Sequence, residues 1–172
     1  MNQIDHVFVT SDHHFGSASL PLGVMRTFTP EQERELVAKW NVVVGSNDLV
    51  YYNGDFSDAK TLLELAEYRR QLNGRIVLIR GNHDVLGDEV YKLVFDDVVD
   101  EVVLEDLDLV IHHCPGDAKG RREIFGHEHR GLASSICRPN AFCSCVQFHD
   151  GYPVSLERVL ESFGMGTDPT RR

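Results

Sequence analysis

The sequence predicts a mixed α/β fold, in which parallel strands of the first half are followed by antiparallel strands of the second half. Three observations carry this prediction. Short β-rich apolar runs alternate with helical patterns up to Asp84, two later β-rich runs are separated by only Glu105 and Asp106, and polar residues follow the strand ends. Alternation of strand and helix is typical of parallel βαβ units, whereas a two-residue connection favours an antiparallel pair.

The first half contains three predicted strands and two predicted helices. Thr29, Pro30 and Gln32 form a helix start, in which Thr29 caps the helix and Gln32 reaches back to the cap. Apolar residues then recur at helical spacing up to Gly45. The remaining elements are strands over 6–10, 49–53 and 75–80 and a helix from about 59 to 72.

The second half is predicted to consist mainly of strands. We expect strands over 98–104, 107–111 and 141–149 and a short helix from about 155 to 163. Between them, residues 123–125 lead into an extended segment that carries His127 and His129.

Length and composition are those of one globular domain. The chain has 172 residues, of which 42% are hydrophobic, and this is enough for a single core. We expect one domain over residues 1–163 and a flexible tail over 164–172. The 17 basic and 27 acidic residues give a formal charge of −10. Stable nucleic-acid binding is therefore not expected, because it needs many cationic side chains on phosphates.

The sequence contains no signal-peptide pattern and no apolar run that approaches the ~20 residues of a membrane span. We therefore expect a cytoplasmic protein that does not associate with membranes. The four cysteines, Cys114, Cys137, Cys143 and Cys145, include no Cys-x-x-Cys pair. A reducing compartment disfavours disulfides, so we interpret these residues as buried free thiols.

The polar side chains at the strand ends offer oxygen or imidazole donors. The set consists of Asp12, His14, Asp55, Asn82, His113, His127 and His129. Because side chains alternate along an extended strand, Asp12 and His14 should point one way and His13 the other. The set is too large for one ion and suits two ions that share Asp55. Such mixed ligation suits Mn²⁺, Fe, Ni²⁺ or Zn²⁺ better than Ca²⁺.

The stretch Gly81-Asn82-His83-Asp84 joins three different chemical functions at one strand end. Asn82 offers an amide oxygen to a hard cation, His83 can donate a proton near neutral pH, and Asp84 can orient the imidazole of His83. Taken alone, the stretch is equally consistent with a surface turn, because Gly, Asn and Asp are common turn residues.

Taken together and in order, these stretches resemble the motifs of the calcineurin-like metallophosphoesterases. The motifs are Asp-x-His at 12–14, Gly-Asp at 54–55, Gly-Asn-His-Asp at 81–84, His-x-Pro at 113–115 and Gly-His-x-His at 126–129. The resemblance extends to about Leu156 and is strongest to the small, capless bacterial and phage members. The chain departs from them at Ser17, where they repeat a histidine, and at Cys143–Gln147, where they have Asn-Val-Gly-Val-Asp.

The resemblance implies a four-layer β-sandwich of two mixed sheets flanked by helices. It also implies two divalent-metal positions bridged by Asp55. The implied ligands are Asp12, His14 and His129 for one ion and Asn82, His113 and His127 for the other. The His-x-Pro pattern selects His113 rather than His112. His83, supported by Asp84, would face the substrate.

The implied activity is phosphoester hydrolysis by a metal-bridging hydroxide, with Mn²⁺ favoured over Fe, Ni²⁺, Zn²⁺ or Mg²⁺. We expect a phosphodiesterase acting on small or nucleotide substrates. The alternatives are a phosphomonoesterase or protein-phosphatase-like enzyme, a non-catalytic metal-binding scaffold and, less favoured, a DNA nuclease. Arg26, Lys119, Arg121 and Arg122 are candidate contacts for substrate phosphate, or else solvated loop cations.

Overall fold

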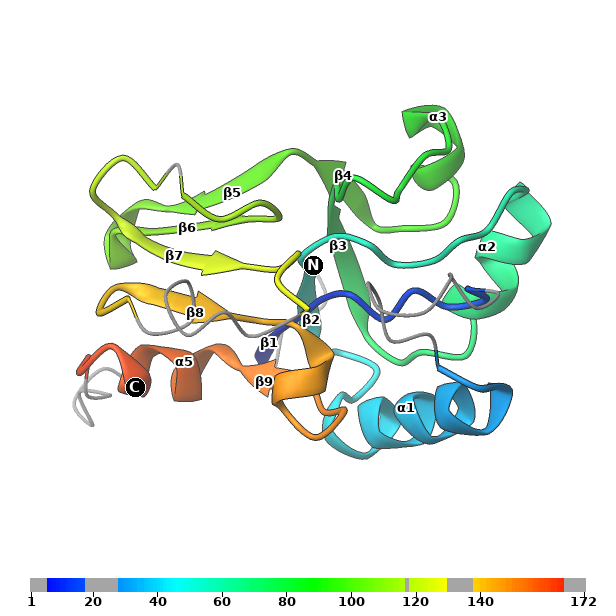
Figure 1. The fold of residues 1–172 in the computed structure, drawn as a ribbon, viewed down its shortest axis with the longest axis horizontal. Coiled ribbons are helices and arrows are strands. Elements are labelled where there is room, and N and C mark those ends of the chain that lie inside the picture. The colour runs from blue at the N-terminus through cyan, green and yellow to red at the C-terminus, as the bar shows by residue number, and fades with distance from the viewer. Residues whose placement is uncertain (1–5, 18–27, 117, 130–137, 166–172) are drawn as a thin grey trace.

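The computed structural model of the chain describes residues 6–17, 28–116, 118–129 and 138–165. Within these ranges, two mixed β-sheets are flanked by helices, as predicted (Figure 1). Of the predicted tail over 164–172, all but its first two residues lie outside the described part. None of the described helices has the length and apolar character that a membrane crossing requires.

The first sheet has five strands in the order β4-β3-β2-β1-β9. Strands β1 (Val7–Thr10), β2 (Leu49–Tyr52), β3 (Arg75–Ile79) and β4 (Asp97–Val99) pair in parallel. Strand β9 (Val154–Ser155) pairs antiparallel with β1 at the edge. The predicted parallel βαβ arrangement of the first half is confirmed.

Helices α1 (Pro30–Val43) and α2 (Leu62–Arg69) connect the first three strands. The predicted capping box of Thr29 and Gln32 is present at the start of α1. Helix α2 begins three residues later than predicted, because a second capping box, Thr61 with Glu64, marks its start. Within the described residues, the other α-helices are α3 (Asp88–Tyr91), which was not predicted, and α5 (Leu156–Ser162).

The second sheet has four strands in the order β5-β6-β7-β8. Strand β5 (Glu101–Leu104) pairs antiparallel with β6 (Leu109–His112). Strands β6, β7 (Arg122–Phe125) and β8 (Ala141–Cys143) pair in parallel. The antiparallel pair around Glu105 was predicted, although the connection itself forms a 3₁₀ turn, η1 (Glu105–Leu107).

Two predicted strands are wrong in extent. The run 98–104 is divided between β4 in the first sheet and β5 in the second, so the chain passes from one sheet to the other at Asp100. Continuous β propensity cannot reveal such a crossing, because both pieces are extended. The predicted strand 141–149 ends at Cys143, and a 3₁₀ turn, η2 (Val146–Phe148), follows it.

Alternate residues of the central strands face two separate cores. Phe8 of β1 and Leu78 of β3 pack with aromatic and aliphatic residues of α1 and α2. Their neighbours Val9 and Ile79 pack with residues of the second sheet, including Ile111. Period-two alternation on a doubly covered sheet explains this division. The first sheet is thus held between the helices and the second sheet.

Candidate metal centre

The predicted site residues lie in the connections that follow five strands. Three of these strands are in the first sheet and two are in the second. Asp12 and His14 follow β1, Asp55 follows β2, Asn82 and His83 follow β3, His113 follows β6, and His127 and His129 follow β7. Carboxyl ends of parallel strands lie at a common edge, so residues far apart in the sequence meet there.

One group of donors brings together Asp12, His14, Asp55 and His129. One donor atom from each lies within 4.8 Å of the others. His14 Nε2 is 3.1 Å from His129 Nε2 and 3.6 Å from Asp55 Oδ2. His129 Nε2 is 3.3 Å from Asp12 Oδ1. The two carboxylates are almost completely buried, with 0% and 1% exposure for Asp12 and Asp55.

A second group of donors adjoins the first. Asn82 Oδ1 lies 3.0 Å from His113 Nε2 and 2.8 Å from His127 Nδ1. His113 Nε2 is also 3.3 Å from Asp55 Oδ2. A single oxygen of Asp55 therefore lies next to His14 in one group and His113 in the other, which is the position that a bridging carboxylate requires.

The hydrogen bonding of His113 indicates that this second group suits a cation. His113 Nδ1 is 2.8 Å from the backbone oxygen of Asn53, an atom that can only accept. In the neutral ring, Nε2 then carries a lone pair that faces Asn82 Oδ1 and Asp55 Oδ2. Three acceptor atoms converge without a hydrogen between them, so a proton or a metal ion is needed to hold them together.

The pKa values of the site residues also indicate that this point attracts a proton or a metal ion. Burial acts to lower the pKa of His113, but contact with the Asp55 carboxylate outweighs it and raises the pKa to about 9. Burial acts to raise the pKa of Asp12, but His129 and His113 bring it down to about 2. The carboxylates of Asp12 and Asp55 thus stay ionised and attract positive charge. The donor set therefore fits divalent metal ions.

The backbone at the site is held in uncommon conformations. Asp12, His14, Asp55 and His127 all have positive φ angles, of 63°, 47°, 57° and 70°. Non-glycine residues with positive φ are uncommon and cluster at functional sites. Extended geometry therefore stops at Thr10, contrary to the prediction that strand alternation separates Asp12 and His14 from His13.

His13 nevertheless lies outside the donor groups. Its Nδ1 is 2.8 Å from the Tyr52 hydroxyl, and its ring stacks on Phe15 at a centroid distance of 5.0 Å. Burial lowers the pKa of His13 to about 3, so the ring is neutral. His112 is likewise directed away, with Nε2 at 2.8 Å from Glu123 Oε2, and His113 is the residue at the site.

Glycines allow the loops to approach one another closely. A Cβ atom on Gly54, whose φ is +85°, would lie 2.3 Å from His113 Nδ1. A Cβ on Gly81 would lie 2.4 Å from the backbone nitrogen of Asp55. Because contacts this short cannot occur, any larger residue at either position would force the Asp55 and His113 loops apart.

Asp84 has a different role from the one predicted. Its Oδ2 accepts hydrogen bonds from the backbone nitrogens of Asp55 and Gly81, and its Oδ1 accepts one from Phe56. Burial raises the pKa of Asp84 to about 6, although these N–H groups act to lower it. Asp84 thus holds the backbone of the Asp55 loop, rather than the imidazole of His83.

The carboxylate beside His83 is Asp58. A ring nitrogen of His83, Nδ1 of His14 and an oxygen of Asp58 lie within 4.8 Å of one another. His14 Nδ1 is buried without a hydrogen-bond partner and lies 3.9 Å from Asp58 Oδ1. Sequence reasoning missed Asp58, and the only signal was a second carboxylate three residues after Asp55.

The segment Cys143–Gln147, where the sequence departs from the resembled family, supports the first donor group. Cys145 Sγ donates a hydrogen bond to Asp12 Oδ2 at 3.2 Å. The side-chain amide of Gln147 lies 3.2 Å from His129 Nδ1 through Oε1 and 2.8 Å through Nε2. These contacts fix the orientation of two donor side chains, Asp12 and His129.

The structure places Arg121 and Arg122, the predicted substrate contacts, away from the donor groups. In the parallel pair of β6 and β7, Arg122 is paired with Leu109 at the start of both strands. His113 and His127 follow the opposite ends of these strands, roughly 10 Å or more away at ~3.3 Å per residue. Arg121 instead pairs with Glu105 at 2.8 Å, and Arg122 reaches the Leu107 carbonyl. Arg26 lies outside the described residues.

Of the three cysteines within the described residues, two are buried as predicted. Cys143 and Cys145 are buried and free, whereas Cys114 is free and exposed. Cys137 lies outside the described residues. Cys114 follows the strand β6 and comes directly after His113, which is buried.

The donor groups are separate from a cavity that the described structure contains elsewhere. That cavity, of about 620 Å³, is lined by Phe148, Tyr152, Arg158 and other residues of η2, β9 and α5. None of the predicted metal ligands lines it. The chemistry of the donors, rather than the size of the hollow, therefore identifies the candidate site.

Three comparisons with known proteins each found a match. The family model described as calcineurin-like phosphoesterase matches residues 6–133. An uncharacterized protein of Methanocaldococcus jannaschii is 39% identical over 89 residues, which are 48% of this chain and 49% of that protein. The chain thus spans about half the length of this curated relative.

The crystal structure of a protein of unknown function from Aquifex aeolicus has a similar fold. Its TM-score with this chain is 0.73 and its sequence identity is 21%, over 91% of this chain and 98% of that one. At this identity, the likeness concerns the fold alone.

Proposed function

The chain belongs to the calcineurin-like phosphoesterase family, a class of metal-dependent phosphoester hydrolases, and we propose that it is a phosphodiesterase for small or nucleotide diesters. We further propose that it uses two divalent ions, with Mn²⁺ preferred. The observation that carries the proposal is the Asp55 carboxylate, whose Oδ2 lies beside both His14 and His113.

Each of the two donor groups would hold one ion. The proposed ligands are Asp12, His14 and His129 on one side, Asn82, His113 and His127 on the other, and Asp55 between them. When bound, divalent ions polarise phosphoryl oxygens and lower the pKa of water. The mixed set of oxygen and imidazole donors is compatible with Mn²⁺, although geometry and metal supply govern selectivity together with ligand type.

His83 and Asn82 are the residues proposed to act on the substrate directly. The His83 ring lies beside that of His14, with centroids 5.1 Å apart, and is partly exposed. As imidazolium, it would give its proton to the leaving alkoxide, and an oxygen of Asp58 lies within 4.8 Å of one of its ring nitrogens. Asn82 uses Oδ1 within the donor group, so its Nδ2 is the atom that would donate to a phosphoryl oxygen.

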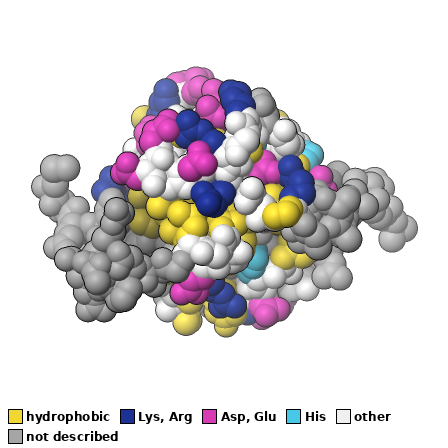
Figure 2. Space-filling view, turned by 90° about the vertical axis from the view of Figure 1, so that its left-hand side faces the viewer, with side chains coloured by type: hydrophobic (Ala, Val, Ile, Leu, Met, Phe, Trp, Pro, Cys, Tyr) yellow, Lys and Arg dark blue, Asp and Glu magenta, His cyan; other side chains and the backbone are white. Residues whose placement is uncertain are grey.

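The charge of the chain supports a small diester over a monoester or a polymer. A formal charge of −10 repels a dianionic monoester more strongly than a monoanionic diester. On the face seen in Figure 2, the described acidic and basic side chains are interspersed, rather than gathered by sign. The free, exposed thiol of Cys114 also fits a reducing compartment such as the cytoplasm.

A paired assay tests the substrate class. Bis(p-nitrophenyl) phosphate and p-nitrophenyl phosphate release the same leaving group, so their rates with Mn²⁺ compare a diester with a monoester directly. We expect the diester to give the higher kcat/KM, and activity on both to disappear in Asp55→Asn. Faster monoester hydrolysis would reject the diesterase proposal, and equal rates in wild type and Asp55→Asn would reject the site.

A further inference from the structure

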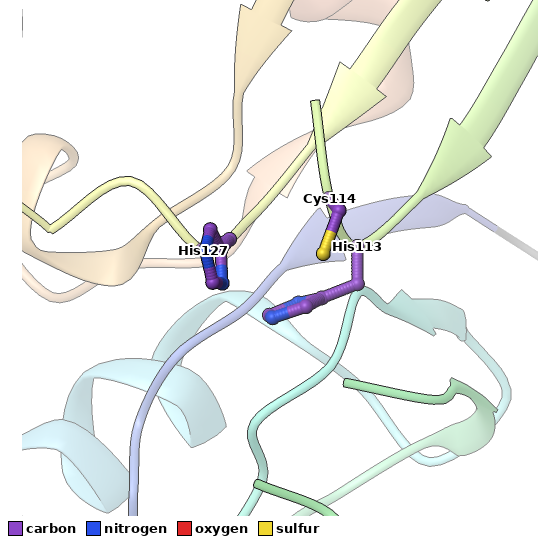
Figure 3. A group of neighbouring side chains, drawn as sticks. All are labelled: His113, Cys114 and His127. Atoms are coloured by element: carbon purple, nitrogen blue, oxygen red, sulfur yellow. The ribbon is translucent and has the colours of Figure 1, made fainter. Parts of the chain in front are cut away.

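Cys114 lies against the second donor group, although the proposed ligand set contains no sulfur. A ring nitrogen from each of His113 and His127 and Sγ of Cys114 lie within 4.8 Å of one another. Figure 3 shows the sulfur facing the two imidazoles, from the turn that follows His113. A thiol this close to two imidazole nitrogens can join them in binding a metal ion.

The surroundings of His113 are a second feature that indicates metal binding at this group. The side chain of His113 is 3% exposed, and its Nε2 faces Asp55 Oδ2 and Asn82 Oδ1. Because Nδ1 donates to the Asn53 carbonyl, Nε2 of the neutral ring directs a lone pair at these two acceptors, and either a proton or a metal ion can hold the three atoms together. Sγ of Cys114 lies within 4.8 Å of a ring nitrogen of this same His113.

We propose that Cys114 is a thiolate ligand of the ion held by Asn82, His113 and His127. This inference rests on the proposed function, because it assumes that ion. On binding, the thiol proton passes to solvent and the sulfur lone pair forms the metal–sulfur bond, with no change of oxidation state.

The two metal positions then differ in chemistry. Asp12, His14 and His129 with Asp55 form a carboxylate-rich position, which suits a hard ion such as Mn²⁺. Cys114 makes the other position softer, so it prefers Zn²⁺ or Co²⁺ over Mn²⁺. We therefore expect the native protein to bind two different metal ions, one at each position.

Cobalt spectroscopy of the full chain tests the thiolate. Metal-free wild type and Cys114→Ser are titrated with Co²⁺, which reports site formation through visible d–d bands and sulfur ligation through a near-ultraviolet charge-transfer band. We expect both signals in wild type and only the d–d bands in Cys114→Ser. Cys143→Ser is the matched control, because it changes a buried thiol outside this group, and it should keep the charge-transfer band.

Metal affinity gives a second measurement. Loss of the thiolate should weaken the binding of one equivalent of Zn²⁺ at least about tenfold, the lower range found when the surroundings of a metal ligand are altered. Mn²⁺ binding should change much less. Calorimetry of wild type and Cys114→Ser with each ion measures both effects without recourse to activity.

The outcomes separate this inference from the proposed function. Cobalt binding with d–d bands but with no charge-transfer band that depends on Cys114 would overturn the thiolate and leave the metal centre intact. Failure of wild type to bind Co²⁺, Zn²⁺ or Mn²⁺ would overturn both. Because Cys114 is exposed, its replacement by serine should not prevent folding.

Discussion

At the scale of single residues, Asp55 links the two donor groups through one atom. Its Oδ2 lies 3.6 Å from His14 Nε2 and 3.3 Å from His113 Nε2, and its Oδ1 accepts a hydrogen bond from the backbone of His83. The same side chain therefore lies next to both donor groups and bonds the segment that carries the proposed acid. A change at Asp55 should affect all three.

Asp55→Asn should weaken both metal positions together, because the amide lacks the charge that two cations would share. We expect the bound metal, measured by elemental analysis after dialysis, to fall for both equivalents. Asp106→Asn, an exposed position in η1, is the control and should retain wild-type loading. Loss of one ion alone would show that Asp55 is not a bridge.

His83→Ala should retain both metal ions and lose most turnover. Its backbone nitrogen, rather than its ring, bonds Asp55, so removal of the ring leaves the ligand set in place. Loss of general acid catalysis should lower kcat by ~10²–10⁴-fold. Metal content and kcat measured on the same sample decide the matter, and an unchanged kcat would remove His83 from the mechanism.

Asp84→Asn should destabilise the fold, since both of its carboxylate oxygens accept backbone N–H groups. An amide has one oxygen to accept with, so at least one buried donor of the Asp55 loop loses its partner, at ~1–3 kcal/mol. Urea unfolding of the metal-free protein measures the change. Stability equal to that of the Asp106→Asn control would contradict this role.

At the scale of elements, the loops that follow strands carry more of the function than the strands do. Strand β1 ends at Thr10, and left-handed residues then redirect the chain, so Asp12 and His14 reach the site by backbone conformation rather than by alternation. Similarly, β8 ends at Cys143, and the turn η2 places Gln147 behind His129. Regular periodicity predicts neither redirection.

The packing of η2 on β8 should make stability depend on pH. His149 stacks on Phe142 at 5.1 Å, and its Nε2 donates to the Cys143 carbonyl. Burial lowers the pKa of His149 below 6.5, against the carbonyl contact. The unfolded state therefore binds more protons, so this contribution is present above about pH 6.5 and is lost as the pH falls toward the folded pKa.

His149→Gln should consequently show a smaller loss of stability between pH 7.5 and pH 5 than wild type does. Urea midpoints of the metal-free proteins at the two pH values measure this difference. The neutral amide retains a donor for Cys143 and does not titrate, so an identical pH dependence in the two proteins would show that His149 does not contribute.

At the scale of the whole molecule, folding collects negative charge and imidazoles at one edge. Two buried carboxylates, Asp12 and Asp55, lie among four histidines, and the chain carries a net charge of −10. Because the unfolded chain disperses these donors, metal ions should bind the native state far more tightly than the unfolded one. Metal binding and folding are thus thermodynamically linked.

Removal of metal should lower thermal stability measurably. A ligand at 100 times its Kd stabilises the native state by about 2.7 kcal/mol per site. We expect Tm to fall on treatment with a chelator and to recover with Mn²⁺ or Zn²⁺. Asp55→Asn should show a smaller response, whereas an equal response in both proteins would place the stabilising ion elsewhere.

Much of the fold could be predicted because its signals are local. Capping residues at Thr29, apolar periodicity in α1 and the β-rich runs of the first sheet depend on neighbours in the sequence. The division of 98–104 between two sheets could not be predicted in this way. Both pieces are extended, and only the packing of distant strands assigns them to different sheets.

The sequence by itself determined which donors this protein has and that they follow strand ends, since residue identity and strand propensity are properties of the chain. Only the tertiary structure decided which donors become neighbours. It placed Asp58 rather than Asp84 beside His83, and Cys114 beside His113 and His127. It also placed Arg121 directly before the start of β7, at the end opposite His127. Such proximities depend on strand direction and loop conformation, which are set by packing between residues far apart in the sequence.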